Sequence, residues 1–205
     1  MKNISRRTVD RALIYIRTLE HLIKEKRYLV SSKDLALITG ISDVQIRKDI
    51  SSFGKVGRPR IGYKTAELNK TLKGFVLQEN VVHVALFGVG HLGTAILRYP
   101  AFNEDNIKLV AAFEKDKSKI GKKINGVRVY PVEMAPKIIK RTHADLGIIA
   151  VPASHSQEVA DIMVLSGLRG IVNFAPASIS VPKSVIVKDI DFTIELLSLF
   201  CNSQR

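Results

Sequence analysis

The sequence VVHVALFGVGHLGTAIL, residues 81–97, decides how this chain folds. A run of apolar residues enters a glycine-rich turn, and the residues after the turn have the spacing of an amphipathic helix. The turn matches G-x-G-x-x-G, in which the first glycine allows a tight turn, the second lets a pyrophosphate approach the backbone, and the third lets helix and strand pack closely. Because the free N–H groups of the helix start would face the anion, we expect a phosphate-binding loop here. Its candidate cofactor contacts are Gly88, Val89, Gly90, His91, Leu92 and Gly93.

An acidic residue stands where a dinucleotide site needs one. Such sites carry a carboxylate about 20 positions after the glycines, at the end of the second strand, where it binds a ribose hydroxyl. Residues 107–113 have the composition of that strand, and Glu114 follows it, 21 residues after Gly93. The alternative is a glycine turn in an α/β domain without a cofactor. Lys115 and Lys117 would favour a 2′-phosphorylated cofactor, whereas Glu114 would repel it.

The positive charge of the chain is concentrated in its first part. The formal net charge is +13, with 17 basic and 8 acidic residues in 1–80 against 15 and 11 in 81–205. A basic segment beside a less charged domain suggests a polyanion as the partner of that segment, although a merely solvated surface has the same composition.

Composition also argues against several classes of protein. The single cysteine, Cys201, permits no intrachain disulfide and no thiolate metal site, and the five histidines lack ligand spacing, so we expect no metal. We find no signal-peptide h-region and no apolar run near the roughly 18 residues of a membrane span, which points to the cytoplasm and to no membrane partner. A chain of 205 residues with 46% hydrophobic content suits one large or two small domains.

The first 52 residues have the pattern of three helices. Ser5 can cap a helix over 6–26, whose predicted buried face consists of Val9, Leu13, Ile16, Leu19, Leu22 and Ile23. Ser31 and Ser32 begin a short second helix that ends at Gly40, and Ser42 caps a third over 43–52. Two short helices about a glycine turn, with Ala36, Gly40, Ile41 and Ile46 at the packing positions, predict a helix-turn-helix. A helical hairpin with a solvated charged face is the alternative.

The next segment predicts a wing. Residues 53–63 carry three glycines, one proline and the cations Lys55, Arg58 and Arg60. This composition is typical of a β-hairpin whose basic tip contacts DNA phosphates or enters a minor groove. In the helix-turn-helix itself the second helix enters the major groove, and only one of Arg47 and Lys48 can point at the bases. The full set of candidate DNA contacts is Lys33, Ser42, Gln45, Arg47, Lys48, Ser51, Lys55, Arg58 and Arg60.

Strands alternate with helices from residue 81 onward, and the strands are apolar throughout. Among them we expect a strand that ends at Pro152 and, after it, a helix that begins at Ser154 and ends at Gly167. This pattern predicts a parallel sheet covered by helices on both faces. Ligands of such sheets lie at the carboxyl ends of the strands, which adds Val151 and Pro152, and Asn173, Ala175 and Pro176, to the candidate cofactor site.

The last predicted helix, residues 192–202, is apolar around nearly its whole circumference. A C-terminal helix that packs on one side does not need this, so we expect a second subunit to cover it. A helix buried in its own domain is the alternative. The predicted fold is therefore α/β, with a winged helix-turn-helix domain (1–78), a Rossmann-like parallel-sheet domain that binds NAD(H) (81–188) and a C-terminal dimerisation helix (189–205).

With these motifs in place, the chain resembles the Rex family of redox-sensing transcriptional repressors. The resemblance covers nearly all residues, and its most specific segments are QIRKDISSFG (45–54), GYKTAEL (62–68), FGVGHLGTAI (87–96), IAVPASHSQEVAD (149–161), GLRGIVNFAPASISVP (167–182) and VKDIDFTIEL (187–196). It implies a homodimer that binds operator DNA when NADH is scarce and releases it when NADH fills the Rossmann domains.

The resemblance also implies roles for single residues. Glu114, where the family more often has Asp, would hold the adenine ribose, and the C-terminal helix would cross to the other subunit, placing Phe192 near the partner's nicotinamide. Arg17, Tyr99 and Asp191 fall where the family couples cofactor binding to the DNA domain. The sequence departs from the family in the wing, where Pro59 and Arg60 replace an arginine and a glycine, so operator preference could differ.

Two other functions fit parts of the sequence. An NAD-dependent oxidoreductase with a basic N-terminal extension would need a positioned acid or base, and the sequence offers no clear candidate, so we expect no enzyme activity. An adaptor whose basic half meets RNA or an acidic protein is less compatible with a helix-turn-helix and a wing, since readers of single-stranded RNA present aromatic stacking surfaces and only 6% of residues are aromatic.

Overall fold

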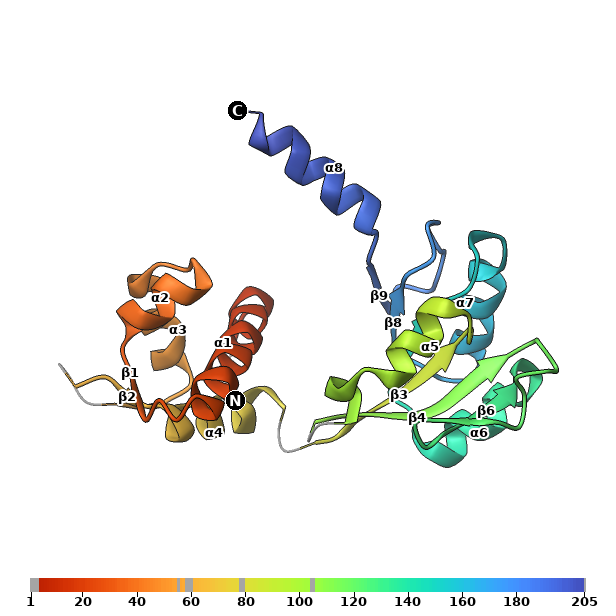
Figure 1. The fold of residues 1–205 in the computed structure, drawn as a ribbon, viewed down its shortest axis with the longest axis horizontal. Coiled ribbons are helices and arrows are strands. Elements are labelled where there is room, and N and C mark those ends of the chain that lie inside the picture. Colours follow the sequence, from red (N-terminus) through yellow and green to blue (C-terminus); the bar gives the residue numbers. More distant parts are fainter. Residues whose placement is uncertain (1–3, 55, 58–60, 78–79, 104–105, 205) are drawn as a thin grey trace. The chain divides into compact units, whose positions relative to one another are not determined.

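The computed structural model describes residues 4–54, 56–57, 61–77, 80–103 and 106–204. The chain divides into two compact units, Met1–Asn80 and Val81–Arg205, each with its own core (Figure 1).

The first unit is helical and carries one small sheet. Its elements are α1 (Arg6–Lys24), β1 (Leu29–Val30), α2 (Ser32–Thr39), α3 (Asp43–Ser52), β2 (Tyr63–Lys64) and α4 (Thr65–Val76). The predicted caps are confirmed: Ser5, Ser31 and Ser42 each accept a hydrogen bond from a backbone N–H of the helix that follows. Gly40 ends α2 with a φ of 71°, which glycine adopts without strain, and so the chain turns sharply into α3.

The buried face of α1 differs from the predicted one. Ala12, Tyr15, Ile16, Leu19 and Leu22 are buried, whereas Leu13 and Ile23 are 44% and 38% exposed. The prediction was wrong at these two positions because it counted only aliphatic residues. A tyrosine and an alanine complete the face instead, and the tyrosine is tolerated there because its hydroxyl group has a polar partner in the core.

The predicted wing is described only in part. Strand β2 pairs antiparallel with β1, so the strand that ends the glycine-rich segment pairs with residues before the helix-turn-helix. Lys55, Arg58, Pro59 and Arg60 lie outside the described residues, as do residues 78 and 79 of the predicted linker.

The second unit is built on a seven-stranded sheet with the order β5-β6-β4-β3-β7-β8-β9. All neighbouring pairs are parallel except β5 and β6, so the predicted parallel sheet is confirmed and an antiparallel edge is added. The strands are β3 (Val82–Phe87), β4 (Ile107–Glu114), β5 (Lys123–Ile124), β6 (Val127–Pro131), β7 (Leu146–Ile149), β8 (Gly170–Asn173) and β9 (Ile186–Asp189). The helices are α5 (His91–Arg98), α6 (Ala135–Thr142), α7 (Ser156–Leu165) and α8 (Phe192–Ser203), and the short 3-10 turns are η1 (Pro100–Asn103), η2 (Val132–Met134) and η3 (Ala153–His155).

The alternation of side chains along β3 divides the core into two layers. Ala85 and Phe87 pack with α6 and α7 on one face of the sheet, and Val84 and Leu86 pack with α5 on the other. Helices therefore cover both faces, as predicted. The order of the strands changes direction at β3, the point where ligands of open parallel sheets bind.

Two boundaries differ from the predicted ones. Strand β7 ends at Ile149 rather than at Pro152, and α7 begins at Ser156 rather than after a cap at Ser154. The reason is the 3-10 turn η3, in which the N–H of His155 bonds to the carbonyl oxygen of Pro152. The side chain of Ser156 instead donates to the carbonyl oxygen of Ala153 at 2.9 Å.

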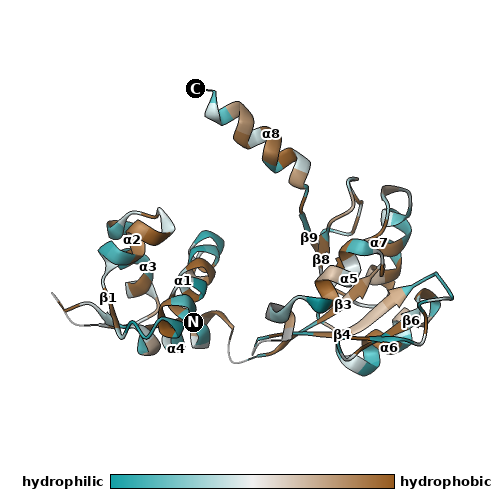
Figure 2. Cartoon of the chain, viewed as in Figure 1, coloured by the Kyte–Doolittle hydropathy of each residue, from teal (hydrophilic) through white to brown (hydrophobic). Residues whose placement is uncertain are grey.

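Helix α8 is rich in hydrophobic residues along its length (Figure 2), and none of its residues from Phe192 to Ser203 is buried. Its six large apolar side chains are between 58% and 68% exposed, namely Phe192, Ile194, Leu196, Leu197, Leu199 and Phe200. Such a surface in a single chain agrees with the prediction that a second subunit covers it.

Candidate functional site

The glycine loop between β3 and α5 is fixed by packing at its two ends. Gly88 has a φ of 94°, and a Cβ atom on it would collide with the carbonyl oxygen of Ala150 at the end of β7. A Cβ atom on Gly93 would collide with the carbonyl oxygen of Gly88. Both positions therefore require glycine for the fold itself, whatever binds at the loop.

Gly90 is different, because nothing in the protein requires it to be glycine. Its φ of −74° is open to any residue, and apart from Gly90 and its chain neighbours no heavy atom lies within 4 Å of the place where a Cβ atom would stand. Gly90 is also the N-cap residue of α5, and no side chain caps the first N–H groups of that helix. An open position beside free N–H groups fits a pyrophosphate that touches the backbone.

Glu114 is held against this loop. One oxygen of its carboxylate accepts the N–H of Val89 at 2.8 Å, and the other accepts the N–H groups of Lys115 and Asp116 at 2.7 and 3.2 Å. The carboxylate thus joins the end of β4 to the phosphate loop. This is the position from which an acidic residue reaches the ribose of a dinucleotide.

A cavity of about 480 Å³ opens beside the loop, and it adds two cations that the sequence did not single out. Arg98 and Lys119 line it together with the loop residues Val89, Gly90 and His91, and with Thr94 and Ala95 of α5. Arg98 lies seven residues after His91 and so on the same face of the helix, which was the signal available in the sequence. Positive charge in this cavity fits the phosphates of a dinucleotide.

Two of the lysines near Glu114, Lys115 and Lys119, lie close to carboxylates. Lys115 donates to both oxygens of Glu158 on α7, at 3.0 and 2.8 Å, and so turns away from Glu114. Lys119 lies 3.9 Å from Glu114 and 3.6 Å from Asp116. Lys117 is exposed and forms no ion pair with another of the described residues. The carboxylate of Glu114 itself favours a 2′-hydroxyl group over a 2′-phosphate.

The residues predicted for the nicotinamide side gather at the ends of β7 and β8. Asn173 is fully buried, and its amide group is used within the protein: it donates to the carbonyl oxygen of Ala177 and to Asp189, and accepts the N–H of Ala175. Asn173 therefore shapes the loop rather than presenting a free polar group. Val151, Pro152 and Pro176 are more exposed, and Phe192 stacks on Phe174 with ring centroids 6.5 Å apart.

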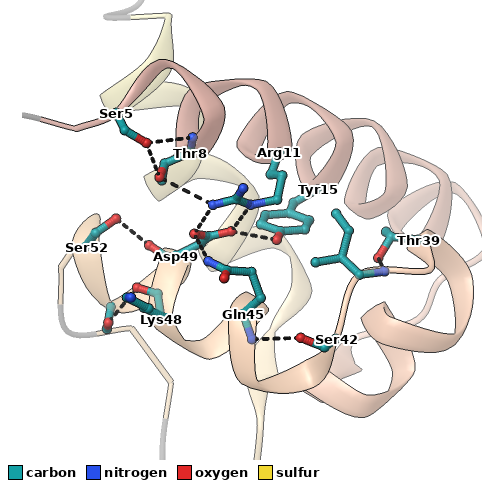
Figure 3. A network of polar contacts seen from close by, with 12 residues as sticks. Ser5, Thr8, Arg11, Tyr15, Thr39, Ser42, Gln45, Lys48, Asp49 and Ser52 are labelled. Atoms are coloured by element: carbon teal, nitrogen blue, oxygen red, sulfur yellow. Dashed lines mark hydrogen bonds and ion pairs between the residues drawn. The ribbon is translucent and has the colours of Figure 1, made fainter.

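The helix-turn-helix contains a polar network that the sequence analysis missed. Asp49 of α3 is buried and accepts two hydrogen bonds from Arg11 of α1, at 2.6 and 2.7 Å (Figure 3). It also accepts the hydroxyl group of Tyr15 and the amide nitrogen of Gln45, both at 2.8 Å. The network joins α1 to α3 and fixes the recognition helix on the core of the unit.

Burial and hydrogen bonding in this network shift the pKa values of Asp49, Tyr15 and Arg11. Burial by itself would raise the pKa of Asp49, but hydrogen bonds from Arg11, Tyr15 and Gln45 outweigh it, so the pKa lies below the usual value. The pKa of Tyr15 is raised by burial and by its hydrogen bond to Asp49. The bond to Asp49 likewise raises the pKa of Arg11. Arg11 and Asp49 are therefore both charged at neutral pH.

Several predicted DNA contacts are engaged inside the protein. The amide nitrogen of Gln45 donates to Asp49 at 2.8 Å, so this candidate DNA contact already has a partner inside the protein. Arg47 donates to Asp43 at 2.6 Å and to Ser32 at 3.2 Å, and its side chain is half exposed. Lys33 and Lys48 are exposed, and neither forms an ion pair with another of the described residues. Ser42 caps α3, and the hydroxyl group of Ser51 donates to the carbonyl oxygen of Lys48.

The three proposed coupling residues belong to different units. Arg17 is exposed on α1, whereas Tyr99 and Asp191 belong to the second unit. Asp191 caps α8 by accepting the N–H groups of Thr193 and Ile194, so it has a structural role in addition to any role in coupling. Tyr99 is 53% exposed and packs edge to face on Phe102.

The described residues contain neither a candidate metal-binding cluster nor a helix that could span a membrane. Within the described ranges, histidine, cysteine, aspartate and glutamate side chains form no cluster of three that could hold a metal ion. Among the helices that the structure describes, none has the length and hydrophobicity of a membrane span.

Each of the two units matches a known protein family. Residues 3–51 match the family described as "Putative DNA-binding protein N-terminus", and residues 80–177 match the family described as "CoA binding domain". The second match covers the sheet with the glycine loop, and the first covers the helix-turn-helix.

Relatives along the whole chain are transcriptional repressors. The redox-sensing transcriptional repressor Rex of Carboxydothermus hydrogenoformans is 39% identical over 199 residues, which are 97% of this chain and 95% of that protein. The protein of the same name from Limosilactobacillus fermentum is 39% identical over 97% of this chain and 92% of its own length.

Solved structures of RSP, a Rex-family repressor, resemble this chain in fold over nearly its whole length. The complex of RSP with β-NAD+ and operator DNA has a TM-score of 0.86 at 30% identity and covers 98% of this chain and 92% of RSP. The complex of RSP with β-NADH has a TM-score of 0.84 and covers 98% of this chain and 94% of RSP.

Proposed function

This chain belongs to the Rex family of redox-sensing transcriptional repressors, and we propose that it binds operator DNA through α3 and releases it when NADH occupies the glycine loop. It is a homodimeric, DNA-binding repressor that binds NADH and NAD+. The observation that carries the assignment of the cofactor site is Gly90, an open glycine before the free N–H groups of α5, beside a carboxylate locked to the same loop.

The roles of the residues follow from their contacts. The N–H groups at the start of α5, with Arg98 and Lys119, hold the pyrophosphate, and Glu114 accepts the hydroxyl groups of the adenine ribose. Val151, Pro152, Ala175 and Pro176 line the nicotinamide side, where Asn173 holds their loop in place. Leu92 and Lys115 flank the site. Phe192 adds an aromatic ring to the nicotinamide side from the C-terminal helix.

The nucleotide supplies binding free energy and no chemistry to the switch. The chain uses this energy to shift the dimer from a form whose two recognition helices fit neighbouring half-sites to a form in which they do not. Arg17, Tyr99 and Asp191 transmit the change. For NADH to act against an excess of NAD+, the second form must prefer NADH by a larger factor than the first does. The apolar surroundings of Pro152 and Phe192 disfavour the charged oxidised ring.

The division of labour follows the two units. Residues 1–78 bind DNA, residues 81–188 bind the nucleotide, and residues 189–205 cross to the partner and form the dimer interface. The DNA phosphates are contacted by the wing cations Lys55, Arg58 and Arg60 and by Lys33, Ser42 and Ser51. The chain acts in the cytoplasm, where it meets the chromosome, and it catalyses no reaction, in contrast to the NAD-dependent oxidoreductase that its second unit resembles in pattern.

Replacing Glu114 with alanine tests the ribose assignment. We expect the affinity for NADH to fall about 10- to 100-fold, because a hydrogen bond to a charged group contributes about 1.5–3 kcal/mol. Isothermal titration calorimetry with the full chain measures it. Glu158→Ala is the control, since Glu158 is an exposed carboxylate of α7 that pairs with Lys115, and its loss should change the affinity by less than about threefold. Unchanged NADH binding by the Glu114 variant would refute the assignment.

Replacing Lys48 with alanine tests the DNA-binding face. We expect weaker binding to every duplex, specific or not, with a slope of log K against log salt that is smaller by about 0.9 for each phosphate that the protein no longer neutralises. Fluorescence anisotropy between 50 and 200 mM salt, roughly the range in which such slopes are read, measures both quantities. Lys140→Ala on α6 is the control and should leave them unchanged. An unaltered salt slope for Lys48→Ala would show that this lysine touches no phosphate.

A further inference from the structure

The outer face of α3 presents one apolar side chain among polar ones. Val44, Arg47, Lys48 and Ser51 are all exposed, and their spacing of three, four and seven residues places them on one face of the helix. Val44 is 63% exposed in the first turn of α3. The N-terminal residues of a recognition helix are those that contact base edges in the major groove.

The polar neighbours of Val44 at this end of the helix are held by the protein. Ser42 caps the helix, and the amide nitrogen of Gln45 is bound to Asp49 (Figure 3). Arg47 is bound to Asp43 and Ser32. The two methyl groups of Val44 are therefore free to meet a ligand, whereas its polar neighbours must first give up or share a partner.

The major groove offers one apolar group to such a side chain, the C5 methyl group of thymine. The cations Arg47 and Lys48 on the same face attract the phosphates on either side and bring the helix into the groove. We propose that Val44 packs on the C5 methyl group of a thymine in each operator half-site and thereby helps to specify the sequence. This inference rests on the proposed DNA-binding function and adds a base-reading residue to it.

The expected size of the contact follows from the burial of one methyl group. Removing that group should weaken binding about fourfold in one half-site, which corresponds to about 0.8 kcal/mol. In a symmetric duplex the removal of both methyl groups should weaken binding about 15-fold, if the two half-sites contribute independently.

The test exchanges thymine for deoxyuridine, which lacks only the methyl group. A tight-binding duplex is first selected from a randomised pool with the wild-type dimer, and each thymine is then replaced in turn and the affinity measured by fluorescence anisotropy without NADH. The same set is measured with Val44→Ala. Leu37→Ala is the matched control, because Leu37 is 86% exposed on α2 and is not part of this face. Both side chains are exposed in the wild-type protein, so we expect both variants to fold.

The proposal predicts that one thymine per half-site is sensitive in the wild-type and Leu37→Ala proteins and insensitive in Val44→Ala. No sensitive thymine in the wild-type protein, or equal sensitivity in Val44→Ala, would overturn it. Both of these results are obtained with a bound duplex, so they leave the DNA-binding function intact. Failure of that function would show itself earlier, as the absence of any selected duplex.

Discussion

Replacing Gly90 with alanine is expected to leave a folded repressor that binds its operator and no longer releases it with NADH. The added methyl group meets nothing in the protein and suits a φ of −74°, so the free energy of unfolding should stay within about 0.5 kcal/mol of the wild type. The same methyl group occupies the space through which the pyrophosphate reaches the backbone. We expect NADH affinity to fall at least about 100-fold, which corresponds to about 2.7 kcal/mol.

Three other glycines provide controls for this result. Gly74→Ala on α4 also places a methyl group in open space; it should raise the free energy of unfolding by up to about 1 kcal/mol, since alanine is the better helix former, and leave NADH binding unchanged. Gly88→Ala and Gly93→Ala force a methyl group against backbone oxygens and should lower the melting temperature of the second unit. Thermal unfolding and calorimetric titration of each variant separate the effects. Wild-type NADH affinity in Gly90→Ala would show that the nucleotide does not lie on this loop.

Replacing Asp49 with alanine is expected to destabilise the DNA-binding unit by about 3 kcal/mol, because the hydrogen bonds that Arg11, Tyr15 and Gln45 donate to this buried carboxylate are lost. Arg11 would lose both its hydrogen bonds to Asp49 and keep only the long one to Thr8, and the hydroxyl group of Tyr15 would lose its acceptor in the core. Hydrogen exchange of the α1 and α3 amides in the full chain measures the local free energy of opening. Asp43→Ala is the control, because its pair with Arg47 is half exposed and should contribute about 1 kcal/mol or less.

The same carboxylate makes a prediction about pH. Because the pKa of Asp49 is lowered in the folded state, its contribution is complete above the unfolded pKa of about 3.9 and is lost as the pH falls through the folded value. The difference in stability between the wild type and Asp49→Asn should thus be constant from about pH 5 to 7 and shrink below about pH 4. A difference that grows toward acid pH, or an Asp49→Ala variant as stable as the wild type, would contradict the account of the network.

Local signals in the sequence predicted most of the fold because they depend on neighbouring residues. Ser31, Gly40 and Ser42 set the ends of the two short helices by their own hydrogen bonds and dihedral angles, and the structure has both helices where these residues place them. The glycine loop and Glu114 were equally readable, since the chemistry of a dinucleotide site fixes their spacing. The 3-10 turn after Pro152 was missed because a serine near a helix start looks like a cap in either arrangement.

The parts that were missed depend on contacts between distant segments. Asp49 meets Arg11 across 38 positions, and no local pattern shows that its carboxylate faces the core. Once that contact is known, the engagement of Gln45 follows from its i, i+4 spacing to Asp49. Arg98 and Lys119 meet in one cavity only because α5 and the loop after β4 lie on the same side of the sheet. Val44 was likewise not singled out, because the importance of its exposed methyl groups depends on the internal partners of Ser42, Gln45 and Arg47.

We propose that reduced nicotinamide dinucleotide bound in the second unit decides whether the dimer holds DNA. NADH, and separately NAD+, can be titrated into a complex of the dimer with a selected fluorescent duplex while the anisotropy is followed. We expect NADH to release the duplex at concentrations at which NAD+ leaves it bound, and Gly90→Ala to abolish the release. Equal release by both forms of the nucleotide, or retention of the duplex at saturating NADH, would show that the dimer does not sense the reduced cofactor.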